Sequence, residues 1–272
     1  MKPIIESLQN PKVKLVMRLR DSRFRRRSGQ IVIDGLREIE AALRAGVKME
    51  AIFCDVGSSE TETAKKIFQS WPPELLQPVA ERVFEKMAYG ERMSHAVATA
   101  ATPNLAIENL RLPLEPLILA LDRVEKPGNI GAVARTASAA GADALILIDP
   151  SCEVFNPNSI RASLGTVFSL PIAAVSASQF KSWLGQAKIG LVRACVDGAV
   201  NMWQADLKGR LAIALGSEAH GLGPEWNRAE WPSVQIPMRQ GADSLNLSVS
   251  AAVLCYEALR QRQDYPPHMA TT

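Results

Sequence analysis

The sequence predicts an α/β protein whose larger part is a mostly parallel sheet covered by helices on both faces. Apolar stretches of strand length at residues 117–121, 144–148 and 211–215 alternate with segments whose apolar residues recur at helical spacing. Glycine-containing turns follow the first and third stretches. Residues 117–149 read as strand, turn, helix and strand, which is a βαβ unit.

Composition sets the broad class. A chain of 272 residues is long enough for two ordinary domains, and 47% hydrophobic with 22% charged residues is a globular composition. The apolar runs are too short to span a membrane, and no signal-peptide pattern opens the chain. Because the cysteines and histidines are scattered, we expect no metal site, no disulfide framework and a cytoplasmic location.

The first 105 residues predict a small α/β domain, followed by a proline-containing linker over 106–116 and a second domain over 117–272. Within the first domain we expect helices at 10–19, 35–45, 61–71 and 79–87, strands at 30–33, 47–54 and 96–99, and a polar loop at 23–29.

The second domain continues the alternation. After the βαβ unit we expect a helix from Asn156 to Gly165, a helix ending at 184–187, and strands at 171–175, 189–195, 211–215 and 234–237. Asp243 or Ser244 is expected to cap a closing helix. The core stripe predicted for this helix is Leu245, Val249, Ala252, Val253, Tyr256 and Leu259.

Positive charge gathers near the start of the chain, although the net charge is only +3. Such a cluster is typical of a surface that contacts a phosphate backbone, and the alternative is a solvated helix face. The residues expected to contact such phosphates are Lys12, Lys14, Arg18, Arg23, Arg25, Arg26 and Arg27.

Two polar residues stand out in the βαβ unit. Asn129 lies at the start of the predicted helix, where its amide could cap it, and Arg135 lies off the apolar stripe. The glycine-rich run after Leu215 would let the backbone approach a ligand at the carboxyl edge of the sheet. It matches neither the dinucleotide fingerprint nor the phosphate loop, which disfavours a nicotinamide-dependent dehydrogenase.

Three segments together resemble the motifs of the SpoU/TrmH RNA ribose methyltransferases of the SPOUT superfamily. They are NIGAVART at 129–136, LGSEAHGL at 215–222, and IPM at 236–238 followed by SLNLSVSAA at 244–252. The connecting segment 156–172 is similar as well, so that the resemblance covers 117–262. The first domain resembles the family's substrate-binding domain at 7–14 and 31–42.

The resemblance implies a SPOUT domain with a deep trefoil knot, a homodimer paired through that domain, and S-adenosylmethionine as cofactor. By motif position the cofactor-binding residues are Gly216, Ser217, Gly221, Ile236, Met238, Ser244 and Leu245. The catalytic residues implied are Arg135, Asn129, Glu218, Ser244 and Asn246. The family gives Arg135 the central role. Since a guanidinium group holds its proton strongly, we expect Arg135 to clamp a phosphate and orient the hydroxyl, with direct proton abstraction left open.

The resemblance thus implies 2′-O-methylation of a ribose in a structured RNA, with ribosomal RNA of the 23S type preferred because of the basic first domain. Transfer RNA is the alternative within this class. A noncatalytic RNA-binding protein that keeps the fold is the alternative outside it, and the joint presence of the five catalytic-motif residues argues against it.

Overall fold

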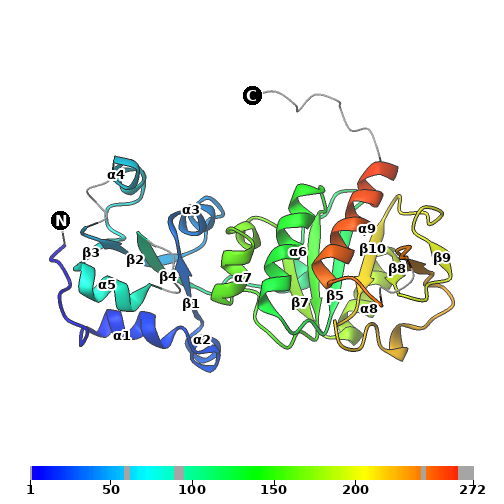
Figure 1. Cartoon of the computed structure of the whole chain (residues 1–272), viewed down its shortest axis with the longest axis horizontal. Helices are drawn as coiled ribbons and strands as arrows, with labels where there is room; N and C mark the ends of the chain where they lie inside the picture. Colours follow the sequence, from blue (N-terminus) through cyan, green and yellow to red (C-terminus); the bar gives the residue numbers. More distant parts are fainter. Residues whose placement is uncertain (1, 58–61, 89–94, 240–242, 263–272) are drawn as a thin grey trace. The chain divides into compact units, whose positions relative to one another are not determined.

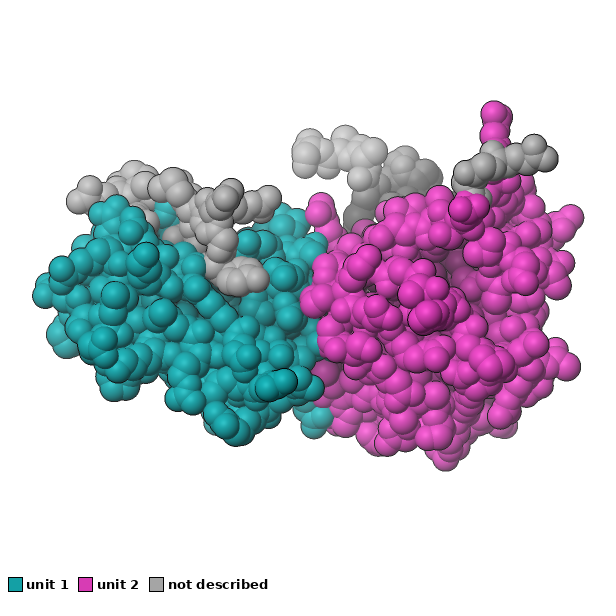
Figure 2. Space-filling model, turned by 60° about the horizontal axis from the view of Figure 1, so that its bottom comes forward, with its two compact units in different colours: residues 1–104, 153–169 teal, residues 105–152, 170–272 magenta. Residues whose placement is uncertain are grey.

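The computed structural model describes residues 2–57, 62–88, 95–239 and 243–262 (Figure 1). The chain divides into two compact units, coloured separately in Figure 2. Unit 1 comprises Met1–Asn104 and Glu153–Ser169, and unit 2 comprises Leu105–Cys152 and Leu170–Thr272. Within the part of the chain that the structure describes, no helix is both long and apolar enough to cross a membrane.

Unit 1 is built on a four-stranded sheet in the order β1-β4-β2-β3. β4 pairs antiparallel with both of its neighbours, and β2 pairs parallel with β3. The strands are β1 (Gln30–Asp34), β2 (Met49–Asp55), β3 (Leu76–Val79) and β4 (Ala96–Ala101). The helices are α1 (Pro11–Arg18), α2 (Ser22–Ser28), α3 (Leu36–Arg44), α4 (Glu62–Ser70), α5 (Glu81–Met87) and α7 (Pro157–Ala162).

Helix α2 replaces the polar loop expected over 23–29. Asp21 accepts a hydrogen bond from the backbone N–H of Phe24 at 2.8 Å, which caps the helix, and Gly29 ends it with φ +66°. The sequence showed four arginines here but no apolar stripe, so the helix was missed. β3 was missed as well, because it is only four residues long and includes Pro78.

The segment Glu153–Ser169 folds with unit 1, although its sequence follows the βαβ unit of the second domain. Helix α7 is shorter than expected and is capped by Asn156, which accepts from the N–H of Asn158 at 2.9 Å. At Gly165, with φ +85°, an added Cβ would lie 2.6 Å from the Cβ of Ala41 in α3. Only glycine allows so close an approach at this backbone conformation.

Unit 2 is built on a seven-stranded sheet in the order β7-β6-β5-β10-β8-β11-β9, and its described strand pairs are parallel. The α/β class with a parallel sheet is thereby confirmed. The strands are β5 (Leu117–Asp122), β6 (Ala144–Ile148), β7 (Ile172–Val175), β8 (Gly190–Ala194), β9 (Val200–Asn201), β10 (Leu211–Leu215) and β11 (Ser233–Gln235). The helices are α6 (Pro127–Ala139), α8 (Ala177–Ala187) and α9 (Leu247–Gln261).

Helices cover both faces of this sheet, so β5, β6 and β10 are buried along their whole length. Figure 1 shows α6 and α9 side by side. A core cluster on one face joins alternate strand residues to Phe180 of α8, to Trp226, and to Ile107 in the predicted linker. The linker therefore contributes to the core of unit 2 instead of lying outside it.

Helix α9 buries a different face from the one predicted. Val249 is 45% exposed and Tyr256 is 51% exposed. The buried residues of the helix are Leu247, Ala251, Leu254, Cys255, Glu257 and Ala258. Both faces carry apolar residues, so periodicity alone could not tell which one meets the sheet. The helix is capped by Asn246, not by Asp243 or Ser244, since Asn246 accepts from the N–H of Ser248 at 2.9 Å.

Candidate active site

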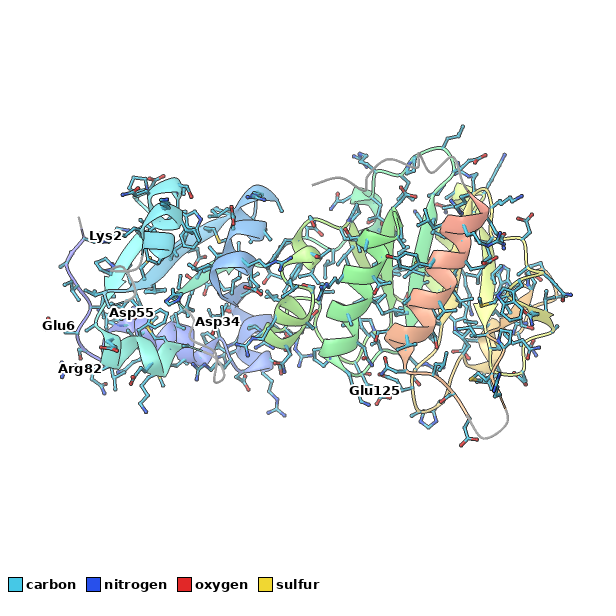
Figure 3. The ribbon with its side chains drawn as sticks, turned by 45° about the horizontal axis from the view of Figure 1, so that its top comes forward. Lys2, Glu6, Asp34, Asp55, Arg82 and Glu125 are labelled. Atoms are coloured by element: carbon cyan, nitrogen blue, oxygen red, sulfur yellow. The ribbon has the colours of Figure 1, made fainter. Side chains whose placement is uncertain are left out.

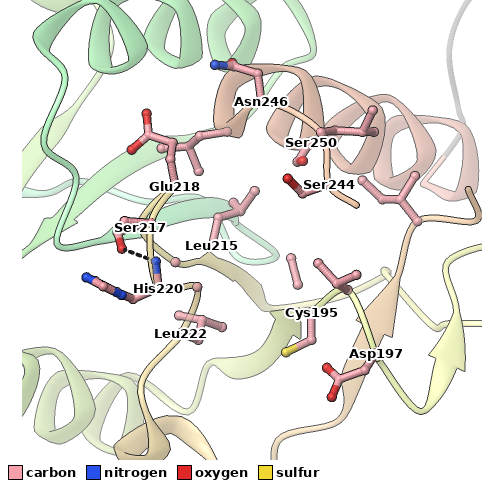
Figure 4. A pocket seen from close by; sticks show the side chains of 18 of the residues that line it. Cys195, Asp197, Leu215, Ser217, Glu218, His220, Leu222, Ser244, Asn246 and Ser250 are labelled. Atoms are coloured by element: carbon pink, nitrogen blue, oxygen red, sulfur yellow. Dashed lines mark hydrogen bonds between the residues drawn. The ribbon is translucent and has the colours of Figure 1, made fainter. Parts of the chain in front are cut away.

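A pocket of about 580 Å³ lies at the carboxyl edge of the unit 2 sheet. Residues 194–197 at the end of β8 and 215–222 at the end of β10 form two of its walls. Val234, Ile236 and Met238, with residues 244–247 and Ser250, close it. Figure 4 shows Glu218 and Asn246 on one side of the pocket and Cys195 and Asp197 on the opposite side. This edge is where open parallel sheets bind ligands, because the loops after neighbouring strands meet there.

The loop over 216–223, called here the pocket loop, is folded tightly on itself. The N–H of Gly221 donates to the carbonyl of Ser217 at 2.9 Å, and the N–H of His220 donates to Oγ of Ser217 at 3.2 Å. A Cβ at Gly216 would lie 1.9 Å from the carbonyl carbon of Gly221. Gly216 must therefore be glycine for the loop to close, and its backbone is left facing the pocket.

The residues expected to bind the cofactor come together in this one pocket, although they lie in three separate segments of the chain. Those that line it are Gly216, Ser217, Gly221, Ile236, Met238, Ser244 and Leu245. Apolar side chains from Leu215, Leu222 and Ile236 lie beside acids and hydroxyls there. Such a mixture suits a ligand with a flat apolar ring system and a polar end.

Three of the residues expected to be catalytic, Glu218, Ser244 and Asn246, also line the pocket. Asn129 does not cap α6, because the helix begins at Pro127 with Lys126 at the cap position. Instead the amide Nδ2 of Asn129 donates a hydrogen bond to Oε1 of Glu218. The first and second motifs thus meet through their side chains.

Arg135 lies on the exposed side of α6, six residues beyond Asn129. That spacing is about 9 Å along the helix axis. Arg135 is not among the described residues that line the pocket. Its position suits a group that reaches a substrate arriving from solvent better than one that holds a ligand inside the pocket.

Several pocket residues lie outside the motifs used in the sequence analysis, among them Lys126, Cys195 and Asp197. Cys195 and Asp197 directly follow β8, so the rule that parallel strands end at one edge could have found them. Burial raises the pKa of the Cys195 thiol, with Arg193 lowering it and Asp197 raising it further. Among the described residues, no cluster of His, Cys, Asp and Glu could hold a metal ion.

The residues expected to bind RNA divide into two kinds. Six of them are exposed in unit 1, namely Lys12, Lys14, Arg18, Arg23, Arg26 and Arg27. Arg25 is only 3% exposed, and its guanidinium binds the carboxylate of Glu153 and the carbonyls of Leu19 and Arg20. The prediction for Arg25 was wrong, because its guanidinium is buried and makes its hydrogen bonds inside unit 1.

A parallel α/β sheet with a loop-built pocket at its carboxyl edge is typical of enzymes that bind a nucleotide-like cofactor. Comparison with known proteins identifies which one. Residues 116–256 match the SpoU rRNA Methylase family, and residues 10–98 match the MRM3-like substrate binding domain. The chain belongs to the SpoU rRNA methylase family and is a methyltransferase, as its motifs predicted.

Similar proteins match along most of their length. The 23S rRNA (uridine(2479)-2′-O)-methyltransferase of Streptomyces viridochromogenes is 28% identical over 88% of this chain and 85% of its own. A crystal structure of an RNA 2′-O ribose methyltransferase is 37% identical, with a TM-score of 0.83 over 95% of this chain and 99% of its own. The AdoMet-bound rRNA methyltransferase from Sinorhizobium meliloti is 28% identical, with a TM-score of 0.83 over 95% and 97%.

Proposed function

We propose that this methyltransferase uses S-adenosylmethionine to methylate a ribose 2′-hydroxyl in ribosomal RNA of the 23S type. The observation that carries the cofactor assignment is that seven residues from two of the motifs, in three separate segments of the chain, line one pocket. Acidic side chains, Glu218 and Asp197, lie among its apolar walls. That lining fits a ligand that combines an adenine ring with a positively charged sulfonium group.

The choice of ribosomal RNA rests on how far each similarity extends. The Streptomyces viridochromogenes 23S enzyme matches across both units of this chain. A structure described as acting on C/U34 of tRNA covers 97% of its own chain but only 55% of this one, with a TM-score of 0.50. The solved chain therefore matches about half of this chain, whereas the rRNA enzyme matches most of it.

The chemistry requires a hydroxyl held in line with a methyl group and a route for its proton. S-adenosylmethionine supplies the methyl on a sulfonium that is already a good electrophile. Glu218, oriented by Asn129, together with Ser244 and Asn246, shapes the end of the pocket where the ribose arrives. Arg135, on the exposed side of α6, binds the neighbouring phosphate and orients the hydroxyl.

The same proposal covers the assembly of the protein. The enzyme is a cytoplasmic homodimer paired through unit 2, and unit 2 contains a deep trefoil knot. Support for the dimer comes from α9, where Val249 and Tyr256 leave an apolar face exposed. In the assembly a substrate phosphate bound by Arg135 lies beside a pocket completed by the partner.

Arg135→Ala tests the assignment. We expect it to remove nearly all transfer of labelled methyl from S-adenosylmethionine to ribosomal RNA while calorimetry finds the cofactor affinity unchanged, because Arg135 lies outside the pocket lining. The proposal also requires that the parent protein methylates ribosomal RNA and does not methylate tRNA. Undiminished turnover of the variant under saturating RNA would remove Arg135 from the mechanism, and an inactive parent would favour the noncatalytic alternative.

A further inference from the structure

The carboxyl end of β5 carries a buried carboxylate that the proposed chemistry does not use. Asp122 is the last residue of the strand and is 1% exposed. Its Oδ2 accepts hydrogen bonds from the indole Nε1 of Trp226 at 3.0 Å and from Nε of Arg123 at 3.1 Å. One carboxylate oxygen therefore joins β5 to the chain that leaves the pocket loop.

Trp226 holds the far end of the pocket loop. It is fully buried, with its ring 6.1 Å from that of Phe180 and 6.0 Å from that of Trp231. Nζ of Lys181 lies 4.7 Å from the ring centre and donates to the carbonyl of Glu225 at 2.9 Å. The near end of the loop is fixed because β10 is central in the sheet, so the loop is held at both ends.

Arg123 lies across the loop. Besides its bonds to Asp122, its guanidinium lies 3.7 Å from Oε1 of Glu225. A Cβ at Gly223 would meet that guanidinium at 2.7 Å and the Glu225 carboxylate at 2.1 Å. The ends of the Arg123 and Glu225 side chains therefore both lie close to the backbone at Gly223.

The turn that begins at Arg123 leads into α6. Figure 3 labels Glu125 on this turn, and the next residue, Lys126, lines the pocket. Three residues further on, Asn129 binds Glu218 of the pocket loop. Asp122 thus lies where the segment that carries Asn129 meets the segment that carries Glu218.

The carboxylate is kept at a cost. Burial raises the pKa of Asp122, while its bonds from Trp226 and Arg123 lower it and the nearby Glu225 raises it. A raised pKa means that the stability contributed by this group is present below its unfolded pKa and is lost as the pH rises through the folded pKa. At neutral pH an asparagine would avoid that loss. A buried carboxyl group that accepts hydrogen bonds from Trp226 and Arg123 beside a binding pocket is a candidate for a role in that pocket.

We propose that Asp122, Arg123 and Trp226 are positioning residues that hold the pocket loop in the conformation that binds S-adenosylmethionine. The inference rests on the proposed cofactor. Without the anchor the loop spends part of its time in other conformations, and the apparent dissociation constant rises in inverse proportion to the competent fraction.

The test measures the dissociation constant of S-adenosylmethionine by calorimetry on the full chain. Asp122→Asn and Arg123→Gln should each weaken binding about five- to ten-fold. The melting temperature of Asp122→Asn should equal or exceed that of the parent, which a merely structural role would not allow. Parent affinity should fall as the pH is lowered through the pKa of Asp122, and the pH profile of Asp122→Asn should lack that fall.

Asp143→Asn is the matched control. Oδ2 of Asp143 accepts from the N–H of Leu117 at 2.8 Å, at the opposite end of the same strand, so cofactor affinity should be unchanged. Trp226→Phe, checked for folding by circular dichroism, should weaken binding like Asp122→Asn. Unchanged affinity in both Asp122→Asn and Arg123→Gln, or an equal loss in Asp143→Asn, would overturn the inference. A parent that binds no S-adenosylmethionine would instead contradict the proposed function.

Discussion

Arg25 and Arg26 are adjacent in the chain and identical in chemistry, yet the fold uses them in opposite ways. Arg25 is buried and binds Glu153 through Nε at 2.9 Å and through Nη2. Arg26 is 68% exposed, and its Nε lies 3.7 Å from the same carboxylate. One arginine ties α2 to the segment that carries α7, while the other stays in solvent.

Arg25→Gln should destabilise the protein by about 3–5 kcal/mol, because it leaves the carboxylate of Glu153 without its buried partner. Arg26→Gln should cost less than about 1 kcal/mol, since exposed ion pairs contribute little. Urea unfolding followed by circular dichroism measures both. Equal effects from the two variants would contradict the structural role given to Arg25.

Burial also affects the expected reactivity of the cysteine thiols, because it raises their pKa. Burial raises the pKa of Cys54 to about 12 and that of Cys255 to about 12, and it raises the pKa of Cys195 as well. The thiolate is the reactive form, so a raised pKa slows alkylation and makes its rate increase with pH.

Iodoacetamide at about pH 8 should therefore leave Cys54 and Cys255 unmodified in the folded protein. Cys195 lines the pocket, so S-adenosylmethionine should protect it. Peptide mass spectrometry with and without the cofactor measures the modified fraction, and alkylation in urea, where all four should react, is the control. If Cys195 were alkylated at the same rate with and without saturating cofactor, the cofactor would have to bind elsewhere.

At the scale of elements, α1 and α2 present the positive charge of unit 1. The guanidinium carbon of Arg18 lies 4.0 Å from the ring centre of Phe24, and that of Arg27 lies 5.5 Å from it. Stacking on an aromatic ring restricts a guanidinium before any ligand arrives, which lowers the entropy lost on binding. The two short helices thus carry prearranged charges suited to RNA phosphates.

The triple variant Lys14→Gln, Arg23→Gln and Arg27→Gln should weaken RNA binding. It should also reduce the slope of log affinity against log salt by roughly 2, at about 0.7 per phosphate contact on a single strand. Filter binding at several salt concentrations measures this. Arg37→Gln, Arg44→Gln and Lys48→Gln remove three exposed charges elsewhere in unit 1 and form the control. Equal slopes in the two triple variants would mean that the charge of α1 and α2 only promotes solubility.

At the scale of the whole molecule, α9 gives unit 2 an apolar surface that one chain does not bury. Its inward side packs with α6 and the sheet, while Val249 and Tyr256 face outward and are about half exposed. Exposed apolar side chains along one helix face are typical of a protein interface. A second copy of the chain fits the proposed homodimer.

Val249→Asp with Tyr256→Asp should convert the dimer to a monomer, because a charge buried in an interface is costly. Light scattering at micromolar concentration measures the mass, and circular dichroism verifies that the variant is folded. Ser182→Asp, at an exposed position of α8, should remain dimeric. A dimeric double variant would place the interface on another surface, and a monomeric parent would rule out the dimer.

The sequence by itself determined the parallel sheet of unit 2 and the family. Fully apolar five-residue runs, such as Leu211–Leu215, must be covered on both faces, and helices between them supply the cover. The motif residues could also be named from the sequence. The structure gives the reason for one of them, because Gly216 has no room for a side chain and the fold needs glycine there.

Only the tertiary structure decided the rest, because it depends on partners far away in the chain. Arg25 is buried by a carboxylate 128 residues away, and the pairing of Asp122 with Trp226 spans 104 residues. Helix α9 has two apolar faces, and packing against α6 and the sheet selects the one that is buried. Local sequence patterns indicate which side chains prefer burial. Whether a charged residue, or one of two apolar helix faces, is buried depends on the distant residues that the fold packs against it.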